Sequence, residues 1–173
     1  MSTVAAVACP AGVVLAGDRL VTSGGHVRSR SRRHVLDFDG VGVAVVGGDV
    51  PALADRLDAE IRAYRTEHRR LQIDAFARLV GDVAADFDTA VLVTAPDDEG
   101  VPRLRSVGPD GGITEESLAA LGSGAALALG VLEAGESPAS LDEAAALARD
   151  ALAAAAERDP GTGTDTDTSR FPA

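Results

Sequence analysis

Short apolar runs separated by turn residues open the chain. Residues 3–8 and 12–17 are almost wholly apolar and rich in Val and Ala, and Cys9-Pro10 lies between them as a turn signal. Runs of this length and composition are typical of strands buried on both faces, and the short break predicts a β-hairpin. The first strand should begin at the very first residues, so the N-terminus is expected to be tied into a sheet.

Further along, strand and helix patterns alternate in groups. Residues 22–25 are expected to form a turn. Two short strands, 35–38 and 41–46, are expected next, joined by a hairpin turn at Asp39-Gly40. Apolar residues then recur at helical spacing, which predicts helices from Asp49 to about residue 70 and over 73–87. Asp49 fits the N-cap of the first of these helices, with Pro51 in its first turn.

The second half repeats this order. Strands are expected over 89–94 and 102–107, and then a helix over 125–134. The Ser140-to-Glu143 spacing is a capping box, which opens a fourth helix that runs to about Arg158. The polar tail, residues 164–173, is either a last edge strand or frayed.

Segregated groups of strands and helices favour an α+β fold rather than a doubly wound sheet. Two strand groups with two helix pairs fit a four-layer αββα sandwich. The length of 173 residues suits one domain over 1–173, with no linker and no internal repeat.

Charge and composition restrict the classes of molecule that the protein is expected to bind. The formal net charge is −11, and all 16 basic residues other than His are Arg, so the chain has no lysine. This acidic surplus argues against nucleic acid or an anionic membrane as a partner, and the composition is typical of a salt-adapted source. No run is long enough to cross a bilayer, which favours a cytoplasmic protein. Cys9 is the single cysteine, which excludes an internal disulfide, and His26 and His68 have no metal-ligand spacing.

Candidate chemistry is concentrated at the N-terminus. Ser2 is small, so Met1 is expected to be removed, which leaves a hydroxyl residue whose own α-amine lies beside it. Such a residue is a nucleophile with a built-in general base. The one basic cluster, Arg28–His34, fits a solvated loop, or alternatively a site floor or subunit contact; the choice stays open for Arg33 and His34.

Several motifs, in order, resemble the proteasome β-type family of N-terminal-nucleophile hydrolases, including its shorter bacterial peptidase subunit and haloarchaeal-type members. The matching stretches extend from Ser2 to Gly163. They are Gly12-Val13-Val14-Leu15-Ala16-Gly17-Asp18-Arg19, Val21-Thr22, Gly122-Ser123-Gly124, Gly130-Val131-Leu132-Glu133, Leu141-Asp142-Glu143-Ala144 and Glu157-Arg158-Asp159-Pro160-Gly161-Thr162-Gly163.

The resemblance implies a role for each matching position. Ser2 falls on the nucleophilic threonine, Asp18 on the buried acid that orients it, and His34 on the catalytic lysine. Ser123 falls on the serine that contacts the α-amine, and Asp159 and Thr162 fall on the acid and the hydroxyl that support it. Gly47 is the implied source of the oxyanion-hole amide. Taken singly, Asp18 also fits a turn acid and Ser123 a helix N-cap.

Two functions follow from the resemblance. The first is a peptidase that hydrolyses peptide bonds through Ser2, without cofactor or metal, inside a ring of its own copies. The implied substrate is a peptide or unfolded protein, and an ATPase unfoldase or α-type subunits are possible partners. The second is an inactive structural or regulatory subunit, because His34 replaces the lysine. Transfer of the acyl group to an amine is a third outcome that no residue favours.

Overall fold

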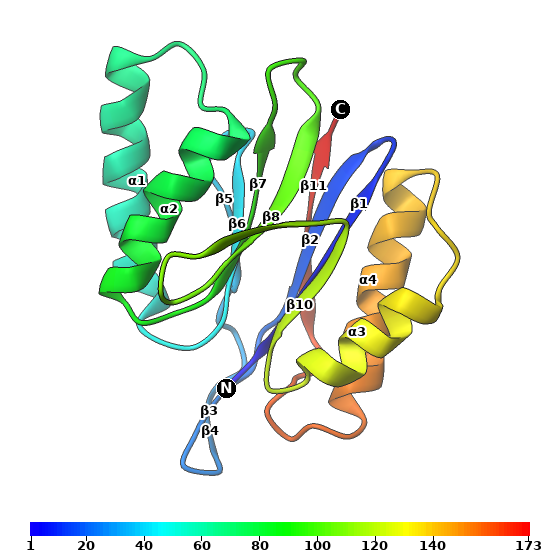
Figure 1. The fold of residues 1–173 in the computed structure, drawn as a ribbon. Helices are drawn as coiled ribbons and strands as arrows, with labels where there is room; N and C mark the ends of the chain where they lie inside the picture. Colours follow the sequence, from blue (N-terminus) through cyan, green and yellow to red (C-terminus); the bar gives the residue numbers. More distant parts are fainter.

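Two antiparallel sheets lie face to face in the computed structural model, which describes all residues 1–173 (Figure 1). The four-stranded sheet has the order β10-β1-β2-β11, and the five-stranded sheet has the order β5-β6-β7-β8-β9. The strands of the first sheet are β10 (Leu118–Gly122), β1 (Thr3–Cys9), β2 (Gly12–Asp18) and β11 (Thr166–Pro172). Those of the second are β5 (Val35–Asp37), β6 (Gly42–Val45), β7 (Val91–Pro96), β8 (Pro102–Val107) and β9 (Ile113–Glu116).

Helix pairs cover the outer faces of both sheets. Helices α1 (Val50–Glu67) and α2 (Ile73–Asp86) pack on the five-stranded sheet, and α3 (Ala125–Ala134) and α4 (Leu141–Ala156) pack on the four-stranded sheet. A third apolar cluster, which includes Leu15, Leu92 and Phe171, fills the space between the sheets. The four-layer αββα sandwich expected from the sequence is confirmed.

Capping side chains fix the helix starts where the sequence placed them. The Asp49 carboxylate accepts the Ala52 N–H at 3.1 Å, at the start of α1. At the start of α4, the Ser140 hydroxyl accepts the Glu143 N–H, and the Glu143 carboxylate accepts the Ala139 N–H at 2.8 Å. These bonds satisfy amides that a helix leaves unpaired in its first turn.

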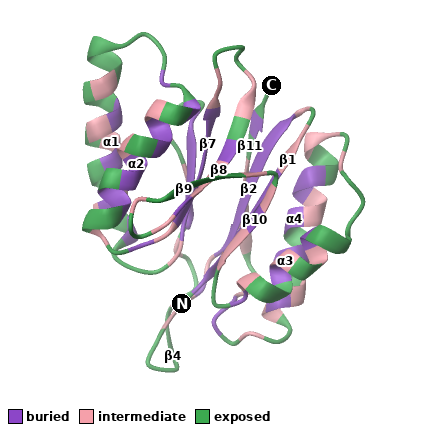
Figure 2. Ribbon diagram, in the orientation of Figure 1, coloured by how far each residue is buried: buried purple, intermediate pink, exposed green.

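The N-terminal hairpin forms the centre of its sheet. Strand β1 pairs with β2 on one side and with β10 on the other, and residues 2–7 and 12–18 are buried (Figure 2). Burial on both faces explains the continuous apolar runs in the sequence. The predicted hairpin is confirmed, and the chain enters the sheet at Thr3.

Three features differ from the sequence expectations. Residues 21–29, expected as a turn and a basic loop, form a projecting hairpin of β3 (Val21–Ser23) and β4 (His26–Ser29). Strands β9 and β10 were not predicted, and the ends of the other elements shift by up to about three residues, the largest shift being the end of α1 at Glu67 instead of about residue 70. Of the two outcomes left open for the tail, the structure shows the edge strand, β11 beside β2. No helix has both the length and the apolar character needed to span a membrane.

Candidate active site

The first residues of the chain are held in a defined position at the end of the four-stranded sheet. Met1 is largely exposed and its amine donates to the Thr22 carbonyl oxygen at 2.6 Å, whereas Ser2 is only 2% exposed. The Ser2 carbonyl accepts the N–H of Ser123 at 3.1 Å. Backbone hydrogen bonds therefore fix the position of Ser2 without any hydrogen bond from its side chain.

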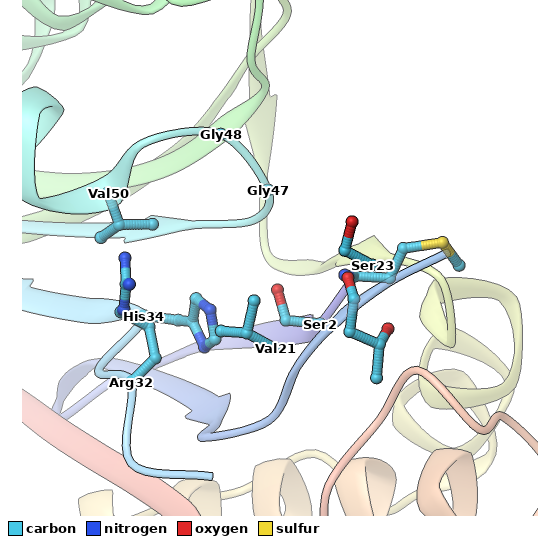
Figure 3. A pocket seen from close by; sticks show the side chains of 10 residues that line it. Ser2, Val21, Ser23, Arg32, His34, Gly47, Gly48 and Val50 are labelled. Carbon is cyan, nitrogen blue, oxygen red and sulfur yellow. The ribbon is translucent and has the colours of Figure 1, made fainter. Parts of the chain in front are cut away.

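A pocket of about 250 Å³ opens beside Ser2 (Figure 3). Ser2, His34 and Gly47 line it, so three of the residues singled out in the sequence meet here. Val21 and Val50 add apolar walls. Arg32 was not singled out in the sequence, yet it also lines the pocket and adds a positive charge there.

His34 lies at the floor of the site, just before β5. Its side chain is 2% exposed, and its Nδ1 atom lies 2.6 Å from the backbone carbonyl oxygen of Asp18. The Asp18 Oδ1 atom is 3.7 Å from the same nitrogen. The His34 carbonyl accepts the Val45 N–H at 2.9 Å, which fixes His34 beside the end of β6.

Asp18 ends β2 and is fully buried behind His34. Its carboxylate accepts three backbone N–H groups: Thr3 at 3.0 Å, Leu20 at 3.4 Å and Gly163 at 2.5 Å. Burial raises the pKa of Asp18, although these bonds and the nearby His34 act in the opposite direction. The carboxylate thereby joins the start of β1, the end of β2 and the loop before β11.

A second polar network lies on the other side of the N-terminus. The Ser123 hydroxyl donates to Asp159 Oδ2 at 2.6 Å, and the Thr162 hydroxyl donates to the same oxygen at 2.5 Å. Thr3 Oγ1 accepts the Gly124 N–H at 2.9 Å and lies 2.6 Å from Thr162 Oγ1. Since the Thr162 hydrogen is already donated to Asp159, the Thr3 hydroxyl must donate to Thr162.

Asp159 is the acceptor at the end of this network. Partial burial opposes its ionisation, but hydrogen bonds from Ser123, Thr162 and the Gly161 N–H outweigh that effect and hold the pKa of Asp159 below its usual value. The positive N-terminus contributes in the same direction. Asp159 therefore carries its negative charge close to the start of the chain.

The loop after β6 supplies amide groups to the pocket. Gly47 and Gly48 both have left-handed backbone conformations, with φ of 73° and 63°. Both line the pocket, and neither N–H donates a hydrogen bond within the protein. Residues with a side chain rarely adopt these angles, which explains the glycine pair. Free amides beside a nucleophile are the groups that stabilise an oxyanion.

The predicted residues thus fall into three groups. Ser2, His34 and Gly47 meet at the pocket, and Asp18 lies behind His34. Ser123, Asp159 and Thr162 bond to one another rather than to the Ser2 hydroxyl, which has no hydrogen-bond partner within the protein. No group of three or more His, Cys, Asp or Glu side chains is placed to hold a metal ion.

Sequence reasoning missed three residues. Thr3 was assigned only to a strand, Gly163 only to the end of a motif, and Arg32 only to a basic cluster. The hydroxyl of Thr3 within an apolar run was the one available signal, because a buried hydroxyl must find a partner. Nothing in the sequence indicates that the Gly163 N–H bonds to Asp18.

Comparison with known proteins agrees with this architecture. The model of the family "Proteasome subunit" matches residues 1–169. Among similar proteins, proteasome subunit beta 1 of Hyperthermus butylicus is 35% identical over 161 residues, which cover 87% of this chain and 79% of the relative. Proteasome subunit beta 2 of Pyrobaculum calidifontis is 38% identical, covering 88% and 79%. Proteasome subunit beta 1 of Thermococcus gammatolerans is 37% identical over 172 residues, covering 94% and 85%.

The four-layer fold with a polar site at the start of its first strand defines the class, and the family match covers nearly the whole chain. The chain belongs to the proteasome subunit family, and these relatives are archaeal β subunits.

Proposed function

We propose that this protein is a proteasome β-type peptidase that cleaves peptide bonds through the hydroxyl of Ser2 after removal of Met1. The observation that carries the proposal is the meeting of Ser2, His34 and Gly47 in one pocket. A nucleophile, a basic nitrogen and a free amide are the three groups that acyl transfer requires. The similarity to archaeal β subunits supports the same function.

The reaction would proceed through an acyl-enzyme. Ser2 Oγ attacks the peptide carbonyl carbon, and the Gly47 N–H stabilises the oxyanion. The hydroxyl proton passes to a base, for which the α-amine of Ser2 and the His34 imidazole are the candidates, and then to the departing amine. Water hydrolyses the ester and restores the hydroxyl. Asp18, through His34, would orient the site, and Ser123, Asp159 and Thr162 would hold the new N-terminus.

The second candidate function is that of a structural or regulatory subunit without catalysis. The observation that favours it is the absence of any lysine, with His34 at the position the family lysine would occupy. A lysine supplies a fixed positive charge, which a neutral imidazole does not. In this second case the Ser2 hydroxyl would still line the pocket but would not react with a peptide or an inhibitor.

Assembly and partners belong to the same proposal. We expect copies of the chain to form a ring that encloses the sites, fed with peptide or unfolded protein by an ATPase unfoldase or by α-type subunits. The acidic, lysine-free composition supports a haloarchaeal type of member, working in the cytoplasm at high salt.

Intact mass before and after treatment with a β-lactone tests the peptidase proposal. We expect loss of Met1 and one adduct, which peptide mapping places on Ser2. Ser2→Ala is the matched control, since alanine also permits removal of Met1 but provides no hydroxyl. A wild-type chain that gains no adduct at high or low salt would overturn the proposal and leave the non-catalytic subunit.

A further inference from the structure

We infer that His34 Nε2 is the general base that takes the proton from Ser2 Oγ, so that reaction does not require a free α-amine on Ser2. This inference rests on the proposed function, because it assigns the base for the proposed nucleophile. Three observations carry it: the hydrogen bond of the other ring nitrogen, the position of the ring, and the position of the N-terminal amine while Met1 is still present.

The hydrogen bond at Nδ1 fixes the tautomer of His34. The partner of Nδ1, 2.6 Å away, is the backbone carbonyl oxygen of Asp18, which can only accept. Nδ1 must therefore carry the hydrogen. In a neutral imidazole the other nitrogen, Nε2, then holds a lone pair and is the basic atom.

The ring leaves this basic nitrogen free at the pocket that Ser2 also lines. Nε2 has no partner within the protein, and both His34 and Ser2 line the pocket. Figure 3 shows the imidazole and the Ser2 side chain at this pocket, with Val21 drawn between them in this view. The Ser2 hydroxyl is likewise without a partner in the protein, so an acceptor and a donor face the same space.

The N-terminal amine is engaged elsewhere. With Met1 in place, the nitrogen of Ser2 belongs to an amide and is not basic. The Met1 amine donates to the Thr22 carbonyl oxygen at 2.6 Å, and its positive charge acts on Asp159. Ser2 nevertheless lines the pocket, so the placement of the hydroxyl beside His34 does not depend on removal of Met1.

The surroundings stabilise the imidazolium that the step produces. The Asp18 Oδ1 atom lies 3.7 Å from Nδ1, and three backbone N–H groups hold that carboxylate in place. A buried acid behind the far nitrogen of a histidine holds the ring in its orientation and lies close to the positive charge that forms on it during the step. Arg32 also lines the pocket and brings a positive charge to it.

In each half of the reaction, His34 takes up one proton and passes it on. The bond from Ser2 Oγ to the carbonyl carbon forms while the hydroxyl proton moves to His34 Nε2. The C–N bond then breaks, and the same proton goes to the departing amine. In deacylation, water gives a proton to Nε2 and attacks the ester; the C–O bond to Ser2 breaks, and Nε2 returns the proton to Oγ.

The absence of lysine makes a direct test possible, because the α-amine is the only primary amine in the chain. Cyanate converts that amine into a urea that is no longer basic, and intact mass verifies that one group has been added. The added group is smaller than Met1, which the site accommodates. The rate of labelling of Ser2 by a β-lactone is then compared with and without cyanate treatment.

We expect cyanate treatment to leave the labelling rate unchanged and His34→Gln to lower it by roughly 10²–10⁴-fold, the range of general-base catalysis. Arg33→Gln is the matched control, because Arg33 is the exposed neighbour of His34 and we expect normal labelling. Loss of labelling after cyanate treatment would overturn the inference, whatever His34→Gln does. This result differs from failure of the proposed function, in which the untreated wild type is not labelled at all.

Discussion

Thr3 holds two parts of the chain together through one hydroxyl. This side chain is fully buried, accepts the Gly124 N–H and donates to Thr162. Thr3→Val keeps the shape but leaves that amide without an acceptor, which costs about 1–3 kcal/mol. We expect urea denaturation to show a loss of this size, and Thr3→Ser, which retains the hydroxyl, to lose less. Equal stability of the Val and Ser variants would mean that the network contributes nothing.

Two carboxyls near the N-terminus should respond to pH in opposite directions. The ordinary pKa of both is 3.8; burial raises the pKa of Asp18, whereas hydrogen bonds lower the pKa of Asp159. The folded state therefore binds the Asp18 proton more tightly than the unfolded state. Its stabilising contribution is complete below pH 3.8 and is lost as the pH rises through the folded pKa. The contribution of Asp159 is present above pH 3.8 and is lost as the pH falls through its lower folded pKa.

Measuring the free energy of unfolding as a function of pH tests the predicted direction of the pH dependence for both carboxyl groups. The difference between wild type and Asp18→Asn should decrease with rising pH above 3.8. The difference between wild type and Asp159→Asn should increase with rising pH below 3.8. Each variant serves as the control for the other, because all remaining carboxyls cancel in the differences. Slopes of the same sign for the two variants would contradict the assignment.

At the level of elements, the start of α3 depends on close contact with its neighbours. A Cβ atom on Gly124 would lie 2.7 Å from Thr162 Oγ1, 2.8 Å from Ala155 Cβ and 2.9 Å from Thr3 Oγ1. All three distances are shorter than atoms tolerate, so Gly124→Ala must displace the helix or the hydroxyl network. We expect thermal or urea unfolding to show a loss of about 1–3 kcal/mol.

Gly130 provides the matched control on the same helix. A Cβ there would meet nothing within 4 Å, and the residue is exposed. Gly130→Ala should therefore stabilise α3 by up to about 1 kcal/mol, the difference in helix propensity between the two residues. If both variants lose stability equally, crowding at Gly124 is not the cause.

At the level of the whole molecule, the tail joins the two sheets. Phe171 of β11 is 3% exposed and packs between the sheets, over Gly42 of β6, where a Cβ would collide with its ring. We expect Phe171→Ala to lower the unfolding free energy by about 3–5 kcal/mol, the usual cost of removing a buried phenylalanine. Arg170→Ala is the control, because Arg170 is exposed and its bond to Asp142 lies at the surface. Its loss should stay below about 1 kcal/mol.

Strands buried on both faces, capped helices and the Ala-rich α4 could be predicted because each has a local cause. Apolar runs determine β1 and β2, and the side chains of Asp49 and Ser140 determine where α1 and α4 begin. Strand β9 could not be predicted, because an exposed edge strand of sequence Ile-Thr-Glu-Glu carries no apolar alternation. Strand β10, Leu-Ala-Ala-Leu-Gly, is a short apolar run, which fits a strand and a segment of helix equally well.

For the candidate site, the sequence indicated which residues take part, and only the fold shows which groups they contact. The resemblance of the sequence to the proteasome β-type family singled out a set of site residues: Ser2, Asp18, His34, Gly47, Ser123, Asp159 and Thr162. The sequence could not indicate that Nδ1 of His34 bonds to a backbone carbonyl, or that Asp18 accepts an N–H from Gly163, 145 residues away. Hydrogen bonds between distant segments follow from the packing of the sheets, which local patterns do not encode.

The sequence by itself thus determined most of the helices and strands, the helix caps, the net charge and the absence of lysine. The tertiary structure decided which hydroxyl faces a pocket, which nitrogen of His34 is basic and which amides remain free at Gly47 and Gly48. The physical reason is that helix and strand patterns depend on neighbours a few residues apart. The protonation and pairing of a buried group, in contrast, depend on atoms that only the folded chain brings within hydrogen-bonding distance.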